Sequence, residues 1–256
     1  MNERQEMIYR ILNKQGNASV KQLKQEVFAS DATIRRDLKQ MEQEGLLIRT
    51  WGGAVSKSKT NSDPPVFVRS KANVNAKNEI ARTAIGFLQS NTTVFLASGT
   101  TVTKLANLFH MCENLTIITN GLDTAAALSN HVSAKVIITG GDIYENYDLV
   151  GTLTESVIDQ FNADLFFFSC SGITAEGFSS SDIFRLSIIK KMKKNSVKTI
   201  LLADTSKVGK KYTYKGFGFE DIDYVVMETI PDDRALRKSL GNKIVTTKTF
   251  FNQKII

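Results

Sequence analysis

Residues 30–54 of this chain, SDATIRRDLKQMEQEGLLIRTWGGA, decide the fold of its N-terminal part. Within them, Ile34, Leu38 and Met41 recur at helical spacing after Ser30. Serine is a favoured N-cap because its hydroxyl accepts a hydrogen bond from a free backbone N–H group of the first turn. The pattern therefore predicts a helix that runs to about residue 44 and ends at Gly45. An apolar strand follows, and paired glycines after it predict a tight turn.

Two shorter patterns precede this helix. Residues Glu3–Gln15 place apolar side chains at helical spacing and stop at Gly16, which predicts an amphipathic helix with a glycine C-cap. A second helix is expected after Ser19, with Val20 and Leu23 on its buried side. Three short helices followed by a strand and a glycine turn therefore form the predicted N-terminal module.

The exposed face of the third helix is rich in groups that can contact DNA. Opposite its apolar side lie Ala32, Arg36, Lys39 and Gln43, flanked by Thr33, Arg35 and Gln40. Arginine in a major groove can bond to O6 and N7 of guanine. The alternative is a solvated helix face, since Asp31, Asp37 and Glu42 neutralise the basic residues within the same helix. The helix–turn–helix order, with a glycine hairpin after it, favours DNA binding.

The stretch from Ser30 to Ala54 also resembles the helix-turn-helix of DeoR-type bacterial transcriptional regulators, with TIRRDL, EGLL and GGA all in register. The resemblance implies that the third helix reads DNA and that the hairpin is a wing. This family usually has histidine before the two glycines, where this chain has tryptophan, so the basic contact of the wing is expected to be replaced either by packing against sugar or by no contact. The expected DNA-binding residues are Ser30, Ala32, Thr33, Arg35, Arg36, Lys39, Arg49 and Trp51.

Beyond this module the sequence predicts a linker and a second domain. Residues 57–75 are rich in Ser, Lys and Asn and contain two adjacent prolines, which predicts a linker with an extended middle. From residue 76, helical patterns alternate with six short β-branched runs, which is typical of a mostly parallel α/β sheet. The expected organisation is a winged helix-turn-helix domain at 1–56, a linker at 57–75 and an α/β domain for effector binding and oligomerisation at 76–256. The six expected strands are Thr93–Leu96, Leu115–Thr119, Lys135–Thr139, Leu165–Phe168, Thr199–Leu202 and Tyr224–Val226.

Small polar residues follow five of these strands. In an open α/β sheet, ligands bind beyond the carboxyl ends of the strands, where backbone N–H groups face an anion. One such turn alone is weak support, but five at successive strand ends indicate a composite pocket. The turns are Ser98-Gly99-Thr100-Thr101, Thr119-Asn120-Gly121, Gly140-Gly141, Ser171-Gly172 and Asp204-Thr205-Ser206-Lys207.

The same turns resemble the effector domain that DeoR-type regulators share with ribose-phosphate isomerase-like proteins, over roughly residues 77–226. The resemblance implies a phosphate at Ser98 to Thr101 and a cation from Lys207. It also places Arg185 near an acidic position of the family and Lys190 near a basic pair, which favours a strongly anionic ligand. The expected effector-binding residues are Ser98, Gly99, Thr100, Thr101, Asn120, Gly140, Gly141, Ser171, Gly172, Arg185, Lys190 and Lys207.

Two departures from the family pattern bear on catalysis. Ala97 and Ser171 stand where carboxylates are expected, and a serine hydroxyl without an activating partner is a poor base near neutral pH. We therefore expect a regulator with no catalytic residues. Two alternatives remain open: a sugar-phosphate isomerase-like enzyme with an accessory N-terminal domain, and a constitutive DNA-binding protein with a vestigial pocket.

Charge and composition agree with a regulator that has anionic partners. The 256 residues carry a net charge of +7 and 42% are hydrophobic, so general disorder is excluded. Residues 1–60 hold eleven basic and seven acidic residues, whereas Lys190 to Lys215 hold nine lysines and one acid. The basic surplus therefore has two parts, one in each predicted domain.

The remaining features complete the expectations. The two cysteines predict free thiols in a reducing cytoplasm, and no cofactor or metal site is expected. We expect neither a signal peptide nor a membrane span, because the first residues are charged and no apolar run is long enough to cross a bilayer. Because two-fold dimers read palindromic operators, we expect a homodimer or homotetramer on double-stranded operator DNA. The sequence thus predicts a DNA-binding transcriptional regulator, a repressor of a sugar or related metabolic operon, controlled by a phosphorylated small-molecule effector.

Overall fold

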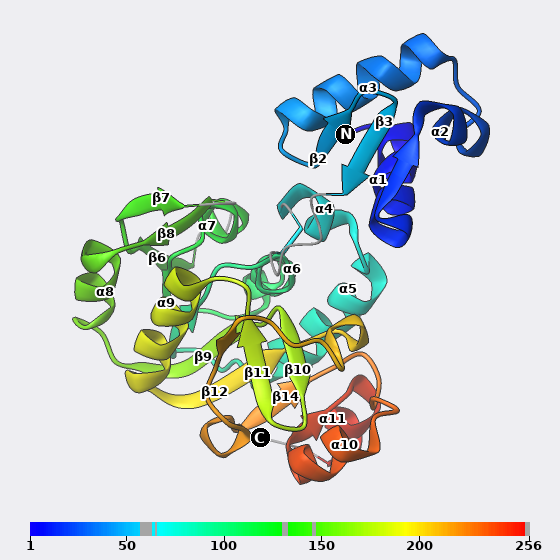
Figure 1. Ribbon diagram of the computed structural model, residues 1–256. Helices are drawn as coiled ribbons and strands as arrows, with labels where there is room; N and C mark the ends of the chain where they lie inside the picture. The colour runs from blue at the N-terminus through cyan, green and yellow to red at the C-terminus, as the bar shows by residue number, and fades with distance from the viewer. Residues whose placement is uncertain (57–62, 65, 130–132, 145–146, 254–256) are drawn as a thin grey trace. The chain divides into compact units, whose positions relative to one another are not determined.

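A computed structural model describes the chain except for residues 57–62, 65, 130–132, 145–146 and 254–256. The chain divides into two compact units, Met1–Pro65 and Val66–Ile256. Figure 1 shows the first as helices beside a small sheet and the second as a larger sheet flanked by helices. In the described part of the chain, no helix is both long enough and apolar enough to cross a membrane.

The first unit contains the three predicted helices. Its elements are α1 (Glu3–Gln15), β1 (Asn17–Ser19), α2 (Val20–Glu26), α3 (Asp31–Gln43), β2 (Leu47–Thr50) and β3 (Gly53–Ser56). Helix α1 ends at Gly16, whose φ of 81° is the left-handed conformation that glycine adopts without strain. The three strands form an antiparallel sheet in the order β1-β3-β2, of which β1 was not predicted.

A shared core fixes the helices of this unit against one another. Ile8 of α1, Leu23 of α2 and Ile34 of α3 are each fully buried, as is Met41 near the end of α3. Each helix therefore has one side in the core and one in solvent, as the helical spacing of the apolar residues predicts.

The second unit is built on a seven-stranded sheet in which every neighbouring pair of strands is parallel. Its strand order is β15-β14-β12-β9-β4-β5-β6. All six predicted strands are present, and β15 is an additional short one at the edge, so the predicted α/β fold class is confirmed. The strands are β4 (Thr93–Leu96), β5 (Leu115–Thr119), β6 (Ala134–Ile138), β9 (Ala163–Ser169), β12 (Ser196–Leu202), β14 (Tyr224–Val226) and β15 (Ile244–Val245).

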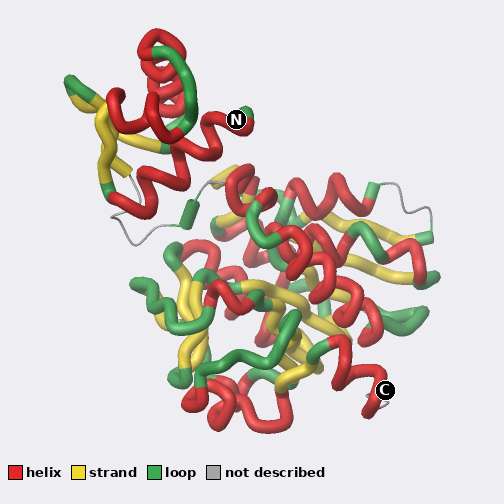
Figure 2. Tube along the Cα trace, turned by 90° about the vertical axis from the view of Figure 1, so that its right-hand side faces the viewer, coloured by secondary structure: helices red, strands yellow, loops and turns green. Residues whose placement is uncertain are grey.

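Helices cover both faces of this sheet, as Figure 2 shows. Successive residues of a strand face opposite ways, and in β9 Phe166 and Phe168 pack with Leu186 of α9 while Phe167 packs with Ile80 of α5. The two resulting cores lie on either side of the sheet. The helices of the unit are α4 (Val66–Lys71), α5 (Val74–Ala84), α6 (Thr100–Ala106), α7 (Leu122–Leu128), α8 (Thr152–Ile158), α9 (Ile183–Lys194), α10 (Arg234–Leu240) and α11 (Thr247–Gln253).

Two smaller sheets accompany the large one. Strands β7 (Asp142–Tyr144) and β8 (Asp148–Val150) form an antiparallel pair. Strands β10 (Gly172–Thr174), β11 (Gly177–Ser180) and β13 (Tyr214–Lys215) form a three-stranded antiparallel sheet. Both follow a strand of the large sheet in the chain and lie close to the loops predicted to bind the effector.

The structure differs from the predicted linker at residues 57–75. Residues 57–62 and 65 lie outside the described part of the chain, but Val66–Lys71 form helix α4 and α5 begins at Val74. The six residues of α4, VFVRSK, are too few to show helical spacing, and their two β-branched valines disfavour a helix. A distant group stabilises it: the Lys77 ammonium donates hydrogen bonds to the carbonyl oxygens of Arg69 and Ala72, at the helix's C-terminal end.

Candidate nucleic-acid interface and ligand pocket

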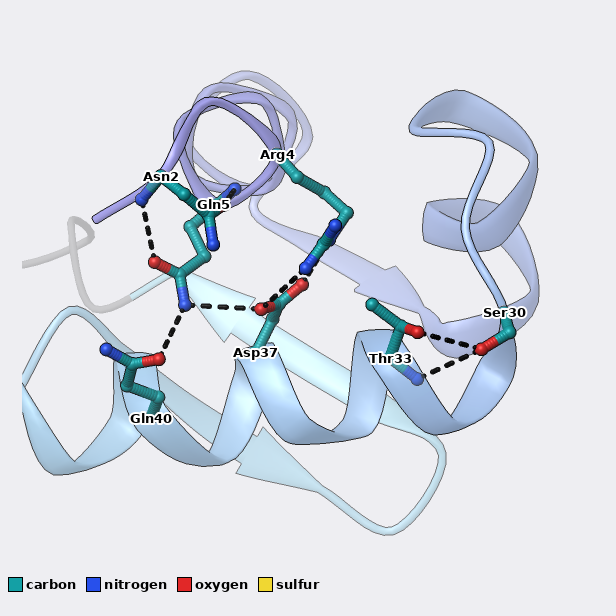
Figure 3. Close-up of polar contacts among 7 residues, drawn as sticks. All are labelled: Asn2, Arg4, Gln5, Ser30, Thr33, Asp37 and Gln40. Carbon is teal, nitrogen blue, oxygen red and sulfur yellow. Dashed lines mark hydrogen bonds and ion pairs between the residues drawn. The ribbon is translucent and has the colours of Figure 1, made fainter.

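Helix α3 begins with the N-cap that the sequence predicts. The Ser30 hydroxyl accepts a hydrogen bond from the Thr33 backbone N–H at 3.2 Å and lies 2.8 Å from the Thr33 hydroxyl oxygen (Figure 3). Both side chains are thereby held at the start of α3. Beyond them Ala32, Arg35 and Arg36 are exposed, and so is Lys39 one turn later.

A buried polar cluster attaches the other side of α3 to α1. The Asp37 carboxylate is 4% exposed and accepts hydrogen bonds from Arg4 Nε at 2.5 Å and Nη2 at 3.3 Å. Gln5 Nε2 donates to Asp37 at 3.2 Å and to the Gln40 amide oxygen at 2.9 Å (Figure 3). This carboxylate raises the pKa of Arg4 because it stabilises the charged guanidinium. The cluster fixes which side of α3 faces outward.

The acidic side chains of α3 pair away from its basic face. Asp37 pairs with Arg4 of α1, and Asp31 lies 3.0 Å from the ammonium of Lys24 in α2. Glu42 accepts a hydrogen bond from the Arg49 backbone N–H at 2.9 Å. Among the described residues, no ion pair includes a basic side chain of α3. Asp31 and Asp37 therefore pair with basic residues of other helices, whereas Glu42 also lies 3.9 Å from the guanidinium of Arg49, which is itself an expected DNA-binding residue.

Strands β2 and β3 form the predicted hairpin after α3. Arg49 pairs in register with Ala54, and the turn between the strands carries Trp51, whose side chain is fully exposed. Gly53 is required where β3 meets β1, because a Cβ atom there would collide with the Ala18 carbonyl oxygen. The hydrogen bond from Arg49 to Glu42 connects the hairpin to α3.

A second aromatic side chain is exposed on this unit and was not predicted. Phe28, in the turn between α2 and α3, is 93% exposed and has a φ of 50°. A bulky residue in the left-handed region is rare because its Cβ crowds the backbone. The sequence offers no signal for this conformation, since glycine or asparagine is the usual residue at such a position.

In the second unit, the first strand-end loop is held by a buried amide. Asn120 is 1% exposed; its side-chain oxygen accepts from the Ser98 backbone N–H at 2.9 Å and its Nδ2 donates to the Leu149 carbonyl at 3.1 Å. Gly99 has a φ of 149°, and a Cβ atom there would approach the Ser169 hydroxyl at 2.8 Å. The Asn120 side chain thus fixes the backbone of the loop that begins at Ser98.

A small pocket opens in front of this loop. Its lining comes from the ends of β4 and β5, from α4 and from the start of β8, and includes Val66, Arg69, Ser98, Gly99, Thr100, Thr103, Gly121, Asp123, Thr124, Tyr147 and Asp148. The cavity volume is only about 10 Å³. The Ser98 hydroxyl is buried and has no hydrogen-bond partner among the described residues. An unsatisfied buried hydroxyl costs free energy, so a ligand group that bonds to it is stabilised there.

The charges at this pocket differ from those the sequence suggested. Arg185 is buried and donates from Nε to the Asp148 carboxylate at 2.8 Å, with Nη2 at 2.7 Å from the same oxygen. This cation therefore reaches the pocket only as half of an ion pair. Burial and the neighbouring Asp148 raise the pKa of Asp123. The pocket thus contains the carboxylates of Asp123 and Asp148. The resemblance to the family had led us to expect cations there.

The other predicted effector residues do not line this pocket. Thr101 is buried behind the loop, Lys190 is exposed on α9, and the backbone N–H of Lys207 donates to the Asp204 carbonyl. The Gly140 carbonyl accepts from the Thr154 hydroxyl at 2.7 Å. The remaining three, Gly141, Ser171 and Gly172, contact α8, Ser181 and the Lys210 backbone respectively.

A larger hollow of about 360 Å³ lies along the same edge of the sheet, at the ends of β12 and β14. It is lined by Asn73, Val74, Asn75, Ala76, Asp204, Thr205, Ser206 and Glu228. One Asp204 carboxylate oxygen is buried without a partner among the described residues, and Glu228 accepts from the Thr205 hydroxyl at 2.5 Å. Residues of the first, second and fifth predicted turns thus line two of the hollows formed by the described residues.

Comparison with known proteins identifies both units. The profile of a DeoR-like helix-turn-helix domain matches residues 4–60, and that of the DeoR C terminal sensor domain matches residues 72–229. The chain belongs to the DeoR family. It is a DNA-binding transcriptional regulator, and its DeoR relatives support this function over that of an isomerase-like enzyme.

Individual DeoR relatives are similar along almost their whole length. The L-fucose operon activator of Haemophilus influenzae is 34% identical over 94% of this chain and 95% of its own. The transcriptional repressor AccR of Agrobacterium fabrum is 32% identical over 90% of this chain and 93% of its own. Among solved structures, ribose 5-phosphate isomerase A of Methanocaldococcus jannaschii is similar at 12% identity with a TM-score of 0.40, over 54% of this chain and 55% of its own.

Proposed function

We propose that this DeoR regulator reads operator DNA with the exposed face of α3 and the β2–β3 hairpin. The observation that carries the proposal is that two acids of α3, Asp31 and Asp37, pair with basic residues of other helices. In the described part of the chain no ion pair then involves the basic face of α3, which leaves its charge for phosphate and base contacts. Arg35, Arg36 and Lys39 lie on that face, and Trp51 extends from the hairpin. Ser30, Ala32, Thr33 and Arg49 complete the proposed surface.

Single arginine substitutions test this surface. We expect Arg35→Ala or Arg36→Ala to weaken specific binding by about 1 to 3 kcal/mol if the residue contacts a base in a bidentate manner. Arg10→Ala is the matched control, because Arg10 is exposed on α1 and not on the α3 face. Binding is measured by fluorescence anisotropy on the DNA upstream of the protein's own gene, with unrelated DNA as competitor. Equal affinities for the parent and both α3 variants would refute the assignment.

The second part of the proposal concerns the effector, a phosphorylated small metabolite that binds in front of the Ser98–Thr100 loop. The buried, unpartnered Ser98 hydroxyl supports this location, and the backbone of the loop is fixed by Asn120. The other predicted effector residues contribute to effector binding indirectly, through the shape and charge of this edge of the sheet. They are Thr101, Gly140, Gly141, Ser171, Gly172, Arg185, Lys190 and Lys207. Screening sugar phosphates by thermal unfolding tests it: a ligand at about 100 times its dissociation constant stabilises by about 2.7 kcal/mol.

The regulated genes and the assembly follow from the same proposal. We expect a repressor of a sugar or related metabolic operon. The relatives of this chain include the transcriptional repressor AccR and, separately, an activator of an L-fucose operon. The effector changes operator affinity only if it binds one arrangement of the protein more tightly than another. We also expect a homodimer or homotetramer, because palindromic operators match two-fold symmetry. Light scattering that finds a monomer on operator DNA would contradict this assembly.

A further inference from the structure

Two aromatic side chains of the first unit are almost completely exposed. Among the described residues, Trp51 and Phe28 are the most exposed of the large hydrophobic side chains. Trp51 belongs to the hairpin that follows α3 in the chain, and Phe28 belongs to the turn that precedes α3. Because hydrophobic stabilisation requires burial, a ring that is 93% exposed contributes almost none to the free protein.

The turn between α2 and α3 explains the backbone of Phe28 but not its ring. Helix α2 ends at Val27, and the backbone N–H of Ala29 donates to the carbonyl of Lys24 at 3.4 Å. This hydrogen bond belongs to the Schellman motif, in which the residue after the C-cap adopts a left-handed conformation. Phe28 is that residue, with a φ of 50°. Glycine adopts this conformation without strain, so the fold needs the backbone of residue 28 and not an aromatic side chain.

The ring is held close to the first turn of α3. Phe28 precedes the N-cap Ser30 by two residues, so the two Cα atoms are at most about 7 Å apart. The Ser30 hydroxyl accepts from the Thr33 N–H at 3.2 Å (Figure 3). Across the turn, the Lys24 ammonium lies 3.0 Å from the Asp31 carboxylate. A cap on each side of Phe28 and an ion pair across the turn therefore fix the base of this side chain relative to α3.

The surroundings of Phe28 favour DNA as its partner. In a DNA-bound helix-turn-helix, the N-terminal residues of the second helix contact base edges in the major groove. The nearest acid of α3, Asp31, is paired with Lys24, whereas Arg35 and Arg36 take part in no ion pair of the described residues. A polyanion is therefore attracted to the end of α3 beside which Phe28 lies. The apolar group that bases present in the major groove is the C5-methyl of thymine, which phenylalanine can contact.

We propose that Phe28 contacts the C5-methyl group of a thymine in the operator and so contributes to the choice of DNA sequence. Arginine recognises guanine through hydrogen bonds, whereas this ring recognises a base by its methyl group. Backbone strain of the kind found at Phe28 is typical of functional sites. The inference rests on the proposed function and adds to it a specificity-determining residue that belongs neither to α3 nor to the hairpin.

Removal of the thymine methyl group tests this contact directly. The DNA upstream of the protein's own gene is prepared once with thymidine and once with deoxyuridine, which lacks only that methyl group. Fluorescence anisotropy then measures the affinity of the parent and of Phe28→Gly for both DNAs. Burial of one methyl group changes affinity about fourfold. We expect the preference for thymine DNA over uracil DNA to be about fourfold smaller in Phe28→Gly than in the parent. An unchanged preference overturns the assignment.

Two further variants control for other effects of the substitution. Phe28→Leu keeps an apolar side chain on the same backbone, so it should lose less than twofold of the preference. Met7→Ala removes a half-exposed apolar side chain of α1 and should keep the whole preference. Phe28→Gly should fold at least as stably as the parent, because glycine relieves the strain. An equal loss of preference in Met7→Ala shows a general effect on the unit and overturns the specific role of Phe28.

The outcomes also separate this inference from the proposed function. A parent that does not bind its upstream DNA contradicts the α3 surface and, with it, the Phe28 contact. If Arg35→Ala weakens binding but Phe28→Gly keeps the thymine preference, the Phe28 contact is overturned and the α3 surface stands. Equal weakening of Phe28→Gly on both DNAs shows packing on the sugar-phosphate backbone, which overturns recognition of the methyl group. Light scattering that finds a smaller oligomer for Phe28→Gly than for the parent places the ring between protein copies and overturns the proposal as well.

Discussion

Replacing Asp37 with asparagine should loosen the DNA-binding unit while leaving the sensor unit unchanged. The carboxylate accepts two hydrogen bonds from Arg4 and one from Gln5, and its side chain is only 6% exposed. Asparagine keeps the shape but loses the charge. Breaking a fully buried ion pair costs about 3 to 5 kcal/mol. Because the Arg4 side chain is 36% exposed, water screens the pair and rehydrates the guanidinium, so we expect about 1.5 kcal/mol.

Native-state hydrogen exchange, read by peptide, measures this loss in the full chain. A decrease of about 1.5 kcal/mol in opening free energy makes the amides of α1 and α3 exchange about 13 times faster. Peptides from the seven-stranded sheet are the internal reference. Asp31→Asn is the matched control, since its ion pair with Lys24 is more than half exposed and contributes about 0 to 0.5 kcal/mol. Equal effects of the two substitutions, or no effect of either, would refute the structural role of Asp37.

Three further substitutions test individual features. Phe28→Gly should stabilise the α2–α3 turn by about 1 kcal/mol because glycine tolerates its left-handed φ, and an equal gain in Phe28→Leu, which keeps the strain, would contradict this in the same exchange experiment. Gly53→Ala should destabilise the β1–β3 pairing by about 1 to 3 kcal/mol, whereas Gly52→Ala, with open space around it, should not; similar exchange rates in both variants would count against the close contact. Lys77 has a pKa of about 8 against an ordinary value of 10.5, so between these values the unfolded chain binds more protons and stability rises with pH. In urea unfolding, the parent should gain about 3 kcal/mol relative to Lys77→Met from pH 7 to 11, and parallel pH profiles would exclude this titration.

Local signals in the sequence were sufficient for most of the architecture. The bounds of α1 and α3 follow from apolar spacing and from caps, and the six strands follow from β-branched runs between turns. Both patterns depend on neighbours in the chain, where propensity and capping act. The α/β fold class and the winged module were therefore predictable, whereas the two-residue strand β15 carries too little pattern to detect.

Interactions between distant residues account for what the sequence did not reveal. Asp37 looks like one more charge on a polar helix until its partner, 33 residues earlier, is known. Arg185 was expected to be a cation for the ligand, but Asp148 on another element pairs with it. Helix α4 depends on Lys77, which lies beyond its own end. The first two contacts are tertiary and the third lies within one helix–helix connection, and periodicity encodes none of them.

Because α3 is attached through Asp37, its two sides have different roles. The side that carries Asp37 is joined to α1 and sets the position of the helix axis. The opposite side carries exposed side chains that lie outside the core of the unit. Arg35, Arg36 and Lys39 can consequently be exchanged one at a time without refolding the unit. Under the proposed function, a duplicated copy of such a gene would acquire a new operator by altering these outward residues, and its scaffold would not have to change with them.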